Sequence, residues 1–357
     1  MDINKLLDEA RESQCSDLHL TVNLPPVVRL AGELKKLDSY PTLSQSDIIK
    51  FCEQIADKDI MKYIEEKEDA DFSYVSSKGF RHRVNVFHQR GNTAIAIRLL
   101  RDDIPTIEEL GLPPIVKEFS NRPRGLVLVT GPTGSGKSTT LAAMINHINK
   151  TRKSHIITIE DPIEYVHKNE CCMINQRELG SDVSDFKVAL RSALREDPDV
   201  ILVGEMRDYE TINSAVTAAE TGHLVLSTLH TTSAATTIDR IIDVFPAHQQ
   251  NQIRAQLASV LVGVISQTLI PKVNSNSRVA CLEILNVTDS ISAMIRDNKV
   301  HMINSAIQTG KAYGMQLLDQ ELAKMVKNNI ISKKDALQKC VSETELNRYT
   351  GSMLIRN

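Results

Sequence analysis

The sequence has few aromatic residues, no tryptophan and no excess of basic residues. Aromatic residues make up 4% of the chain, so single-stranded nucleic acids would find few side chains on which their bases could stack. The formal net charge of −3 provides no global basic field of the kind that attracts DNA or RNA. These absences disfavour helicases and recombinases, and we expect no nucleic-acid partner.

Membrane-spanning and disulfide-rich classes are also disfavoured. The first residues are acidic where a signal peptide would be basic and then apolar. The longest apolar stretch, residues 257–270, is interrupted by Ser259, Ser266 and Gln267, and is predicted to form a buried helix. The 6 cysteines include no C-x-x-C pair, so neither a zinc cage nor a disulfide framework is indicated. We therefore expect a cytoplasmic protein with reduced thiols.

The most informative stretch runs from Gly131 to Ser138 and completes the pattern G-x-x-x-x-G-K-[ST] of a phosphate-binding loop. Its glycines permit backbone conformations closed to other residues, so that successive N–H groups can point at phosphates. An apolar run at 126–130 precedes the loop and a helical pattern at 139–148 follows it, which is the setting that the motif requires. A Gly-rich surface turn would not need this setting.

Side chains of the loop have predicted roles. Lys137 adds a positive charge near the β and γ phosphates, and the Ser138 hydroxyl can occupy one coordination position on Mg²⁺. The predicted nucleotide-binding residues are Thr133, Gly134, Ser135, Gly136, Lys137, Ser138 and Thr139.

Three further apolar runs, at 156–159, 200–203 and 224–228, each end in polar residues. The alternation of strand and helix patterns from residue 116 to 271 predicts a mainly parallel sheet with covering helices. Ligands of such sheets bind outside the carboxyl ends of the strands. The polar residues at these ends should therefore converge on the phosphate loop.

Two carboxylates at these strand ends suit nucleotide chemistry. Glu205 follows its strand closely and fits the second Mg²⁺-binding element of a phosphate-loop nucleotidase, so Ser138 and Glu205 are the predicted metal residues. Glu164 is a candidate to orient or deprotonate the water that attacks the γ-phosphate. The alternatives are a solvated acid at a strand end for Glu205 and a surface acid for Glu164.

Two histidines, His223 and His230, flank the run at 224–228. On an extended strand they are too far apart to share a metal ion. Each is either a structural histidine bonded to a neighbouring carbonyl or a sensor of the γ-phosphate or of a domain interface.

A basic stripe is predicted on the helix expected at 185–196. Its members are Lys187, Arg191 and Arg195, which share one helix face and form either a solvated, salt-bridged stripe or a subunit contact.

The chain is predicted to have two domains and an appendage. The predicted segments are a domain at 1–100, a linker at 101–115, a core at 116–271 and a C-terminal region at 272–357. Prolines and a capping-box start at Thr106 indicate that the linker runs into a helix.

Within the first domain, helical patterns at 1–13 and 46–66 are combined with strand patterns, as in a small α+β domain. Residues 81–86 alternate polar with mostly apolar side chains, which predicts a strand with one buried face. In the C-terminal region a strand at 279–285 is followed by helical patterns, and the end from Ser342 to Asn357 is predicted to be frayed.

Several of these motifs resemble those of a known family, the secretion and type IV pilus motor ATPases. The matching segments are GPTGSGKSTTLAAMI, ITIEDPIEYVH, NQRELGSD, ALREDPDVILVGEMRD and AAETGHLVLSTLHTTSAATTIDRIIDVFP. The resemblance covers nearly the full length. It implies an α/β fold with an N-terminal PAS-like α+β domain, a RecA-like P-loop ATPase core and a helical C-terminal tail.

The resemblance also implies an activity and an assembly. Members of the family form homohexameric rings that hydrolyse ATP, with Mg²⁺, to ADP and phosphate and couple this reaction to mechanical work. Glu164 resembles the catalytic glutamate of the family and Glu205 the carboxylate of its second metal motif. His223 and His230 resemble the two histidines of its histidine box.

Two arginines are implied to reach the nucleotide from the N-terminal domain. Arg83, in RVNVF, and Arg98, in AIRLL, resemble the family's arginines that contact the phosphates. A guanidinium added to the transition state can be worth about 10³ to 10⁵ in rate. The alternative for both arginines is ordinary salt bridging on a sheet face.

The resemblance is strongest to family members that retract pili in twitching motility. Assembly and secretion members typically carry an extra N-terminal region and a four-cysteine zinc motif, which this sequence does not show. The retraction segment A-I-R-N-L-I-R-E is matched by residues 290–297 only in its second half. The implied partner is a pilus platform protein of the inner membrane, at whose cytoplasmic face the ring would work, associated with the membrane through the platform only.

Other classes remain as alternatives. A pilus-assembly or type II secretion ATPase would belong to the same family. A P-loop kinase would yield a phosphorylated metabolite, but no acceptor pocket or lid is readable. A nucleic-acid translocase of the RecA class would show DNA-stimulated turnover. A nucleotide-gated adaptor without turnover is disfavoured by the pairing of Glu164 with Glu205.

Overall fold

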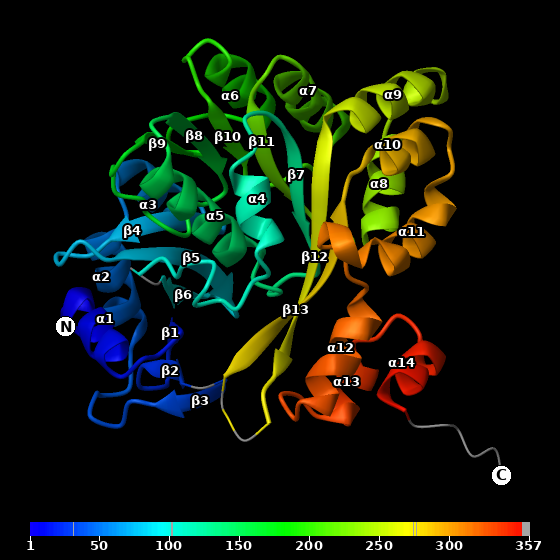
Figure 1. The fold of residues 1–357 in the computed structure, drawn as a ribbon. Coiled ribbons are helices and arrows are strands. Elements are labelled where there is room, and N and C mark those ends of the chain that lie inside the picture. Colours follow the sequence, from blue (N-terminus) through cyan, green and yellow to red (C-terminus); the bar gives the residue numbers. More distant parts are fainter. Residues whose placement is uncertain (31, 101–102, 274, 276, 352–357) are drawn as a thin grey trace. The chain divides into compact units, whose positions relative to one another are not determined.

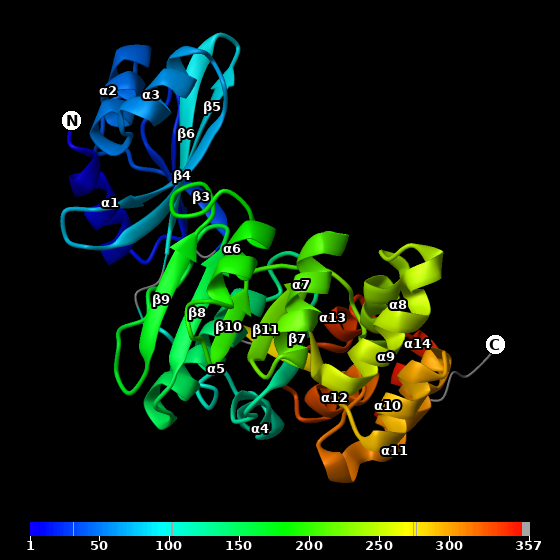
Figure 2. The same ribbon diagram turned by 90° about the horizontal axis from the view of Figure 1, so that it is seen from above.

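The computed structural model describes residues 1–30, 32–100, 103–273, 275 and 277–351. The chain divides into two compact units, Met1–Asp103 and Ile104–Asn357, and each has its own sheet (Figures 1 and 2). Positions 101 and 102 of the predicted linker and positions 352–357 of the predicted frayed end lie outside the described residues. No helix within the described ranges is long and apolar enough to cross a membrane.

The first unit is built on a six-stranded sheet in the order β3-β2-β1-β6-β5-β4, in which all paired strands are antiparallel. Its elements are α1 (Ile3–Glu12), β1 (Asp17–Leu20), β2 (Val27–Leu30), β3 (Glu33–Lys36), α2 (Gln45–Ile55), α3 (Lys58–Glu65), β4 (Ala70–Val75), β5 (Arg81–Gln89) and β6 (Asn92–Leu99). The helices pack on the sheet through one apolar core that includes Leu6, Phe51 and Val84. The predicted alternation along β5 is confirmed, since His82, Val84 and Val86 are buried.

Two predictions in this unit were incomplete. The single helix predicted at 46–66 is two helices, because Ala56 is extended and the Asp57 side chain accepts a hydrogen bond from the N–H of Ile60, which starts α3. The strand β3 was not predicted, because all of its residues are exposed and it therefore lacks an apolar alternation.

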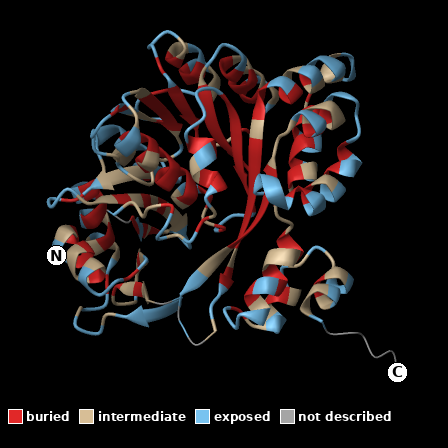
Figure 3. Ribbon diagram, viewed as in Figure 1, coloured by how far each residue is buried: buried red, intermediate tan, exposed pale blue. Residues whose placement is uncertain are grey.

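The second unit contains a seven-stranded sheet in the order β13-β12-β7-β11-β10-β8-β9. Neighbouring strands are parallel, as predicted, except that β13 is antiparallel to β12. The strands are β7 (Gly125–Thr130), β8 (His155–Glu160), β9 (Met173–Glu178), β10 (Val200–Val203), β11 (Leu224–Leu229), β12 (Leu261–Pro271) and β13 (Arg278–Asn286). Figure 3 shows that buried residues concentrate on these strands.

Helices cover both faces of this sheet. Along β7, Leu126 and Leu128 belong to one apolar core, whereas Val127 and Val129 belong to another, as expected when successive side chains point to opposite faces. The helices of this unit are α4 (Ile115–Ser120), α5 (Lys137–Thr151), α6 (Phe186–Ala193), α7 (Tyr209–Glu220), α8 (Ala234–Asp243), α9 (Gln250–Val260), α10 (Asp289–Arg296), α11 (Ile303–Thr309), α12 (Leu318–Lys327), α13 (Lys333–Leu337) and α14 (Glu343–Thr350), with short 3₁₀ turns at Ala247–Gln249, Val300–Met302 and Gly310–Tyr313.

The buried helix predicted at 257–270 was wrong over most of its length. Helix α9 ends at Val260, and Leu261–Pro271 forms β12, which is paired with β7 on one side and β13 on the other. Val262, Val264, Ile265 and Thr268 are β-branched and favour a strand. A short apolar run buried on both faces has no periodicity that separates strand from helix.

The frayed end predicted from Ser342 was also wrong for 343–350, which form α14. The Ser342 side chain accepts from the N–H of Glu345, and Gly351, with φ of 80°, ends the helix in the left-handed conformation. The carboxylate of Asp319 on α12 accepts the N–H groups of Val341 (2.8 Å) and Ser342 (2.9 Å), which ties α14 to α12.

The basic stripe on α6 is shorter than predicted. The helix ends at Ala193, so Arg195 lies beyond it. Lys187 is ion-paired with Glu210 of α7, as in the salt-bridged alternative. Near Thr106 the predicted capping bonds to Glu109 are present, but turns follow before α4 begins.

Candidate functional site

The phosphate loop lies between the end of β7 and the start of α5. Gly136, with φ of 89°, precedes the first residue of the helix in a conformation that favours glycine. At Gly131 the limit is space, because a Cβ atom would lie 2.2 Å from the carbonyl oxygen of Gln267. The backbone of the loop is therefore held against β12, with its helix N-terminus open to an anion.

Gln267 fixes this contact. Its side-chain Nε2 donates to the carbonyl oxygen of Ser135 at 2.6 Å, and its Oε1 accepts from the hydroxyl of Thr140 at 2.7 Å. Beside it, Thr130 donates to the hydroxyl of Ser266 at 2.9 Å. Sequence reasoning missed Ser266 and Gln267, which it took as interruptions in an apolar helix. The signal available was two consecutive polar residues inside a buried run.

Lys137 is the first residue of α5 and is buried. Its Nζ donates to the carbonyl oxygens of Gly131 at 2.9 Å and Pro132 at 3.3 Å. Burial lowers the pKa of Lys137, and the negative charges of Glu205 and Glu164 oppose that shift. Both predicted carboxylates thus act electrostatically on the lysine of the loop.

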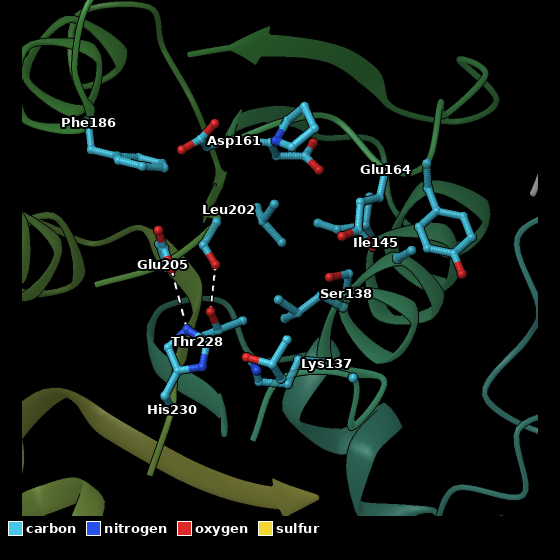
Figure 4. A pocket seen from close by; sticks show the side chains of 18 of the residues that line it. Lys137, Ser138, Ile145, Asp161, Glu164, Phe186, Leu202, Glu205, Thr228 and His230 are labelled. Carbon is cyan, nitrogen blue, oxygen red and sulfur yellow. Dashed lines mark hydrogen bonds and ion pairs between the residues drawn. The ribbon is translucent and has the colours of Figure 1, made fainter. Parts of the chain in front are cut away.

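A cavity of about 200 Å³ opens beside the start of α5 (Figure 4). It is lined from the loop and from the ends of β8, β10 and β11, so the predicted convergence is present. The predicted residues that line it are Thr133, Gly134, Lys137, Ser138, Glu164, Glu205 and His230. Of the remaining loop residues, Ser135 is buried and Thr139 shares a hydrogen bond of 2.9 Å with the hydroxyl of Tyr165.

Glu164 and Glu205 approach this cavity from different elements (Figure 4). Glu164 lies on the segment after β8, and its carboxylate has neither a hydrogen bond nor an ion pair with any residue that the structure describes. The largely buried Glu205 follows β10, and its carboxylate accepts from Nε of Arg207 at 2.6 Å and lies 3.5 Å from Nε2 of His230. Glu164 is therefore available to water, whereas Glu205 already has a cationic neighbour in Arg207.

The donor set fits Mg²⁺ better than a transition metal. The cavity offers the hydroxyl of Ser138 and the carboxylate of Glu205, which are oxygen ligands. Among the described residues no group of three or more His, Cys, Asp or Glu side chains could hold a metal ion. A site with few protein ligands is what Mg²⁺ uses when water and phosphate oxygens complete its shell.

The two histidines are not brought together. His230 lines the cavity, whereas His223 precedes the amino end of β11 and does not line it. Nδ1 of His223 donates to the carbonyl oxygen of Ala218 at 2.9 Å and lies 3.2 Å from the hydroxyl of Thr221. This contact is the one expected of a structural histidine.

Arg83 and Arg98 lie opposite each other on β5 and β6 in the first unit. Nε of Arg83 donates to Asp71 at 3.2 Å, and Nε of Arg98 donates to Asp17 at 3.2 Å. The sheet-face salt bridges considered from the sequence are thus present. They hold two guanidinium groups on one face of the sheet.

Comparison with known proteins shows which family this chain belongs to. The family model described as "Type II/IV secretion system protein" matches residues 1–355. The chain belongs to this family. The family resemblance seen in the motifs is therefore confirmed.

Among curated relatives, the "Type IV pilus retractation ATPase PilT" of Pseudomonas aeruginosa is 50% identical over 339 residues, covering 95% of this chain and 98% of that protein. The "Twitching motility protein" of Neisseria gonorrhoeae is 48% identical over 307 residues, covering 86% of this chain and 82% of that protein. A solved structure of the pilus retraction motor PilT with bound ADP matches with a TM-score of 0.91 at 47% identity, covering 98% and 99% of the two chains. The α/β fold with a RecA-like core is thereby confirmed.

Proposed function

We propose that this protein is a motor ATPase that hydrolyses ATP to power type IV pilus retraction in twitching motility. The observation that carries the ATPase activity is that Lys137, Glu164 and Glu205 line one cavity, and retraction is inferred from the relatives. The family membership and the names of the relatives support the same activity. The alternative within the family is a pilus-assembly or type II secretion ATPase.

The residues of the cavity divide the chemistry between them. Loop amides and Lys137 hold the β and γ phosphates of ATP. Ser138 and Glu205 are the residues that would hold Mg²⁺, which when bound neutralises negative charge on the phosphate oxygens. Glu164 orients the attacking water or takes its proton. His230, beside Glu205, senses the γ-phosphate.

The rest of the proposed mechanism concerns coupling between domains and subunits. The proposed segments are a PAS-like domain at 1–100, a linker at 101–115, a core at 116–271 and a helical C-terminal region at 272–357. Arg83 and Arg98 of the first segment contact the phosphates and couple ATP to domain closure. His223, which is bonded to Ala218 outside the cavity, is assigned to the domain interface. The active form is a homohexamer.

The proposed partner is a pilus platform protein of the inner membrane, and nothing chemical happens to it. The motor works in the cytoplasm at the inner face of the membrane and is held there only through the platform. No nucleic acid takes part.

Release of inorganic phosphate from ATP and Mg²⁺ by the purified protein tests the activity. We expect Lys137→Ala to lose ATP binding and turnover, and Glu205→Gln to bind ATP while turnover falls about 100-fold or more. Near-normal turnover in both variants would refute the assignment. A phosphorylated small molecule in place of free phosphate would indicate a kinase, and stimulation by DNA would indicate a translocase.

Pili of a deletion strain test the direction of force. Pili that accumulate without retracting indicate a retraction motor, whereas bald cells indicate an assembly motor. The Lys137→Ala gene should fail to restore retraction where the wild-type gene succeeds, and this pair controls for effects of the deletion itself.

A further inference from the structure

Strand β9 holds the segment that carries Glu164. Gln176 and Glu178 are separated by one residue on this edge strand, so their side chains point to the same face of the sheet. They belong to the NQRELGSD motif. The roles proposed for the phosphate loop, Glu164 and Glu205 leave this motif without a function. Register pairs them with Thr158 and Glu160 of β8, from which the Glu164 segment continues.

The side-chain amide of Gln176 makes three hydrogen bonds to this segment. Its Nε2 donates to Oε1 of Glu160 at 3.1 Å and to the carbonyl oxygen of Tyr165 at 2.8 Å. Its Oε1 accepts from the backbone N–H of His167 at 2.8 Å. One side chain thus contacts the segment at its start, directly after Glu164, and at its end.

Glu178 holds the residue on the other side of Glu164. Its side chain is buried, and Oε2 accepts from the backbone N–H of Ile163 at 3.0 Å. The hydroxyls of Tyr165 and Thr139 lie 2.9 Å apart, which fixes the segment to α5 as well. The neighbours of Glu164 in the chain, Ile163 and Tyr165, are both anchored, while its own carboxylate stays on the cavity.

We propose that Gln176 and Glu178 are positioning residues that set where the Glu164 carboxylate lies relative to the phosphate loop. This inference rests on the proposed function. A carboxylate that orients water must be placed closely, since an error of about 1 Å can cost roughly 100-fold in rate. A loop backbone without these hydrogen bonds would not hold the Glu164 carboxylate that closely.

Gln176→Leu tests the proposal, because it keeps approximate size and removes all three hydrogen bonds. We expect kcat to fall about 10- to 100-fold, with the Kd for ATP unchanged because the phosphate loop is untouched. The matched control is Asn175→Leu on the same strand, whose side chain bonds to His155 at 2.9 Å and not to the Glu164 segment. The control should turn over ATP like the wild type.

A double-mutant cycle separates positioning from general loosening of the fold. If Gln176 acts through Glu164, then Gln176→Leu should cause no further loss of kcat in the Glu164→Gln background. An equal proportional loss in both backgrounds, an unchanged kcat, or a parallel loss of ATP affinity would overturn the proposal. If Gln176→Leu does not fold, Gln176→Asn, which is shorter by one methylene, takes its place with the same expectations.

Hydrogen exchange provides a readout that does not depend on turnover. In Gln176→Leu the amide of His167 should exchange faster, while the amide of Ile163, bonded to Glu178, remains protected. Unchanged protection of His167 would overturn the proposal. A wild-type protein that releases no phosphate would instead refute the proposed function, and the exchange result would still decide whether β9 holds the segment.

Discussion

Gln267 of β12 is hydrogen-bonded to Ser135 of the phosphate loop: the side-chain Nε2 of Gln267 donates to the carbonyl oxygen of Ser135 at 2.6 Å. Gln267 also accepts a hydrogen bond from the hydroxyl of Thr140. The side-chain amide of Gln267 therefore contacts both the loop and the first turn of α5. The amide is buried, so water cannot replace these bonds if it is removed.

Gln267→Leu should therefore weaken ATP binding. Leaving buried polar groups unsatisfied costs about 1 to 3 kcal/mol, which corresponds to roughly 5- to 150-fold in Kd if the loop is disordered by the change. Titration with a fluorescent ATP analogue measures the effect. The control is Gln256→Leu, since Gln256 is only partly buried and its side-chain amide donates to the exposed Glu220. Equal affinities of both variants would contradict the role of Gln267.

Arg207 should compete with Mg²⁺ for Glu205. Its side chain is 72% exposed, and its Nε lies 2.6 Å from the Glu205 carboxylate. Exposed ion pairs contribute up to about 1 kcal/mol, so Arg207→Ala should lower the Mg²⁺ concentration for half-maximal turnover by up to about fivefold. Arg348→Ala, which removes another exposed arginine, should leave this concentration unchanged. Lower turnover with the same Mg²⁺ dependence would assign Arg207 a different role.

Loss of the Arg83 side chain should lower turnover more than loss of its salt bridge with Asp71. Loss of a guanidinium that contacts the transition state is expected to lower kcat by up to about 1,000-fold in Arg83→Ala. Asp71→Asn removes the ion pair with Arg83 but keeps the arginine, so its turnover should stay near that of the wild type. Steady-state phosphate release measures both. If the two variants behave alike, Arg83 serves the sheet and not the nucleotide.

His82 should make the stability of the protein depend on pH. It is fully buried, and neither ring nitrogen has a hydrogen-bond partner in the described part of the chain. Burial, assisted by the charge of Arg11, lowers the pKa of His82 from 6.5 to about 4. The unfolded chain then binds the proton more readily than the folded protein. The contribution of the neutral His82 ring to the stability of the folded protein is therefore fully present above pH 6.5. It is lost as the pH falls from 6.5 toward 4.

Urea unfolding at several pH values measures this effect. The free energy of unfolding should fall by up to about 1.4 kcal/mol per pH unit for each such histidine across this window. His82→Leu should give a shallower dependence, although His167, whose pKa burial also lowers to about 4, will retain part of it. His301→Leu changes an exposed histidine and should reproduce the wild-type slope. Identical slopes in all three proteins would contradict the prediction.

The parts of the site that could be predicted are those encoded locally. The phosphate loop is a contiguous motif. Glu205 and the Glu164 segment each follow an apolar run that predicts a strand. Their convergence followed from a general rule for parallel sheets, since β7, β11, β10 and β8 are consecutive in the sheet.

The parts that could not be predicted depend on pairing across long sequence separations. Gln267 acts on a loop more than a hundred residues earlier, and the contact exists only because β12 pairs with β7. The apolar run at 257–270 predicts a helix, and that prediction does not place Gln267 beside the loop. Likewise, α14 has a short and polar sequence, and the burial of Leu346 together with the acceptor supplied by Asp319 stabilises it.

The pairing of Asp319 with Val341 and Ser342 has a practical consequence. A chain cut before Val341 would leave a largely buried negative charge without the amides that solvate it, so such a truncation is expected to harm folding of the whole second unit. Fluorophores and affinity labels for single-molecule or force experiments are therefore better attached after Gly351 than in place of the last helix.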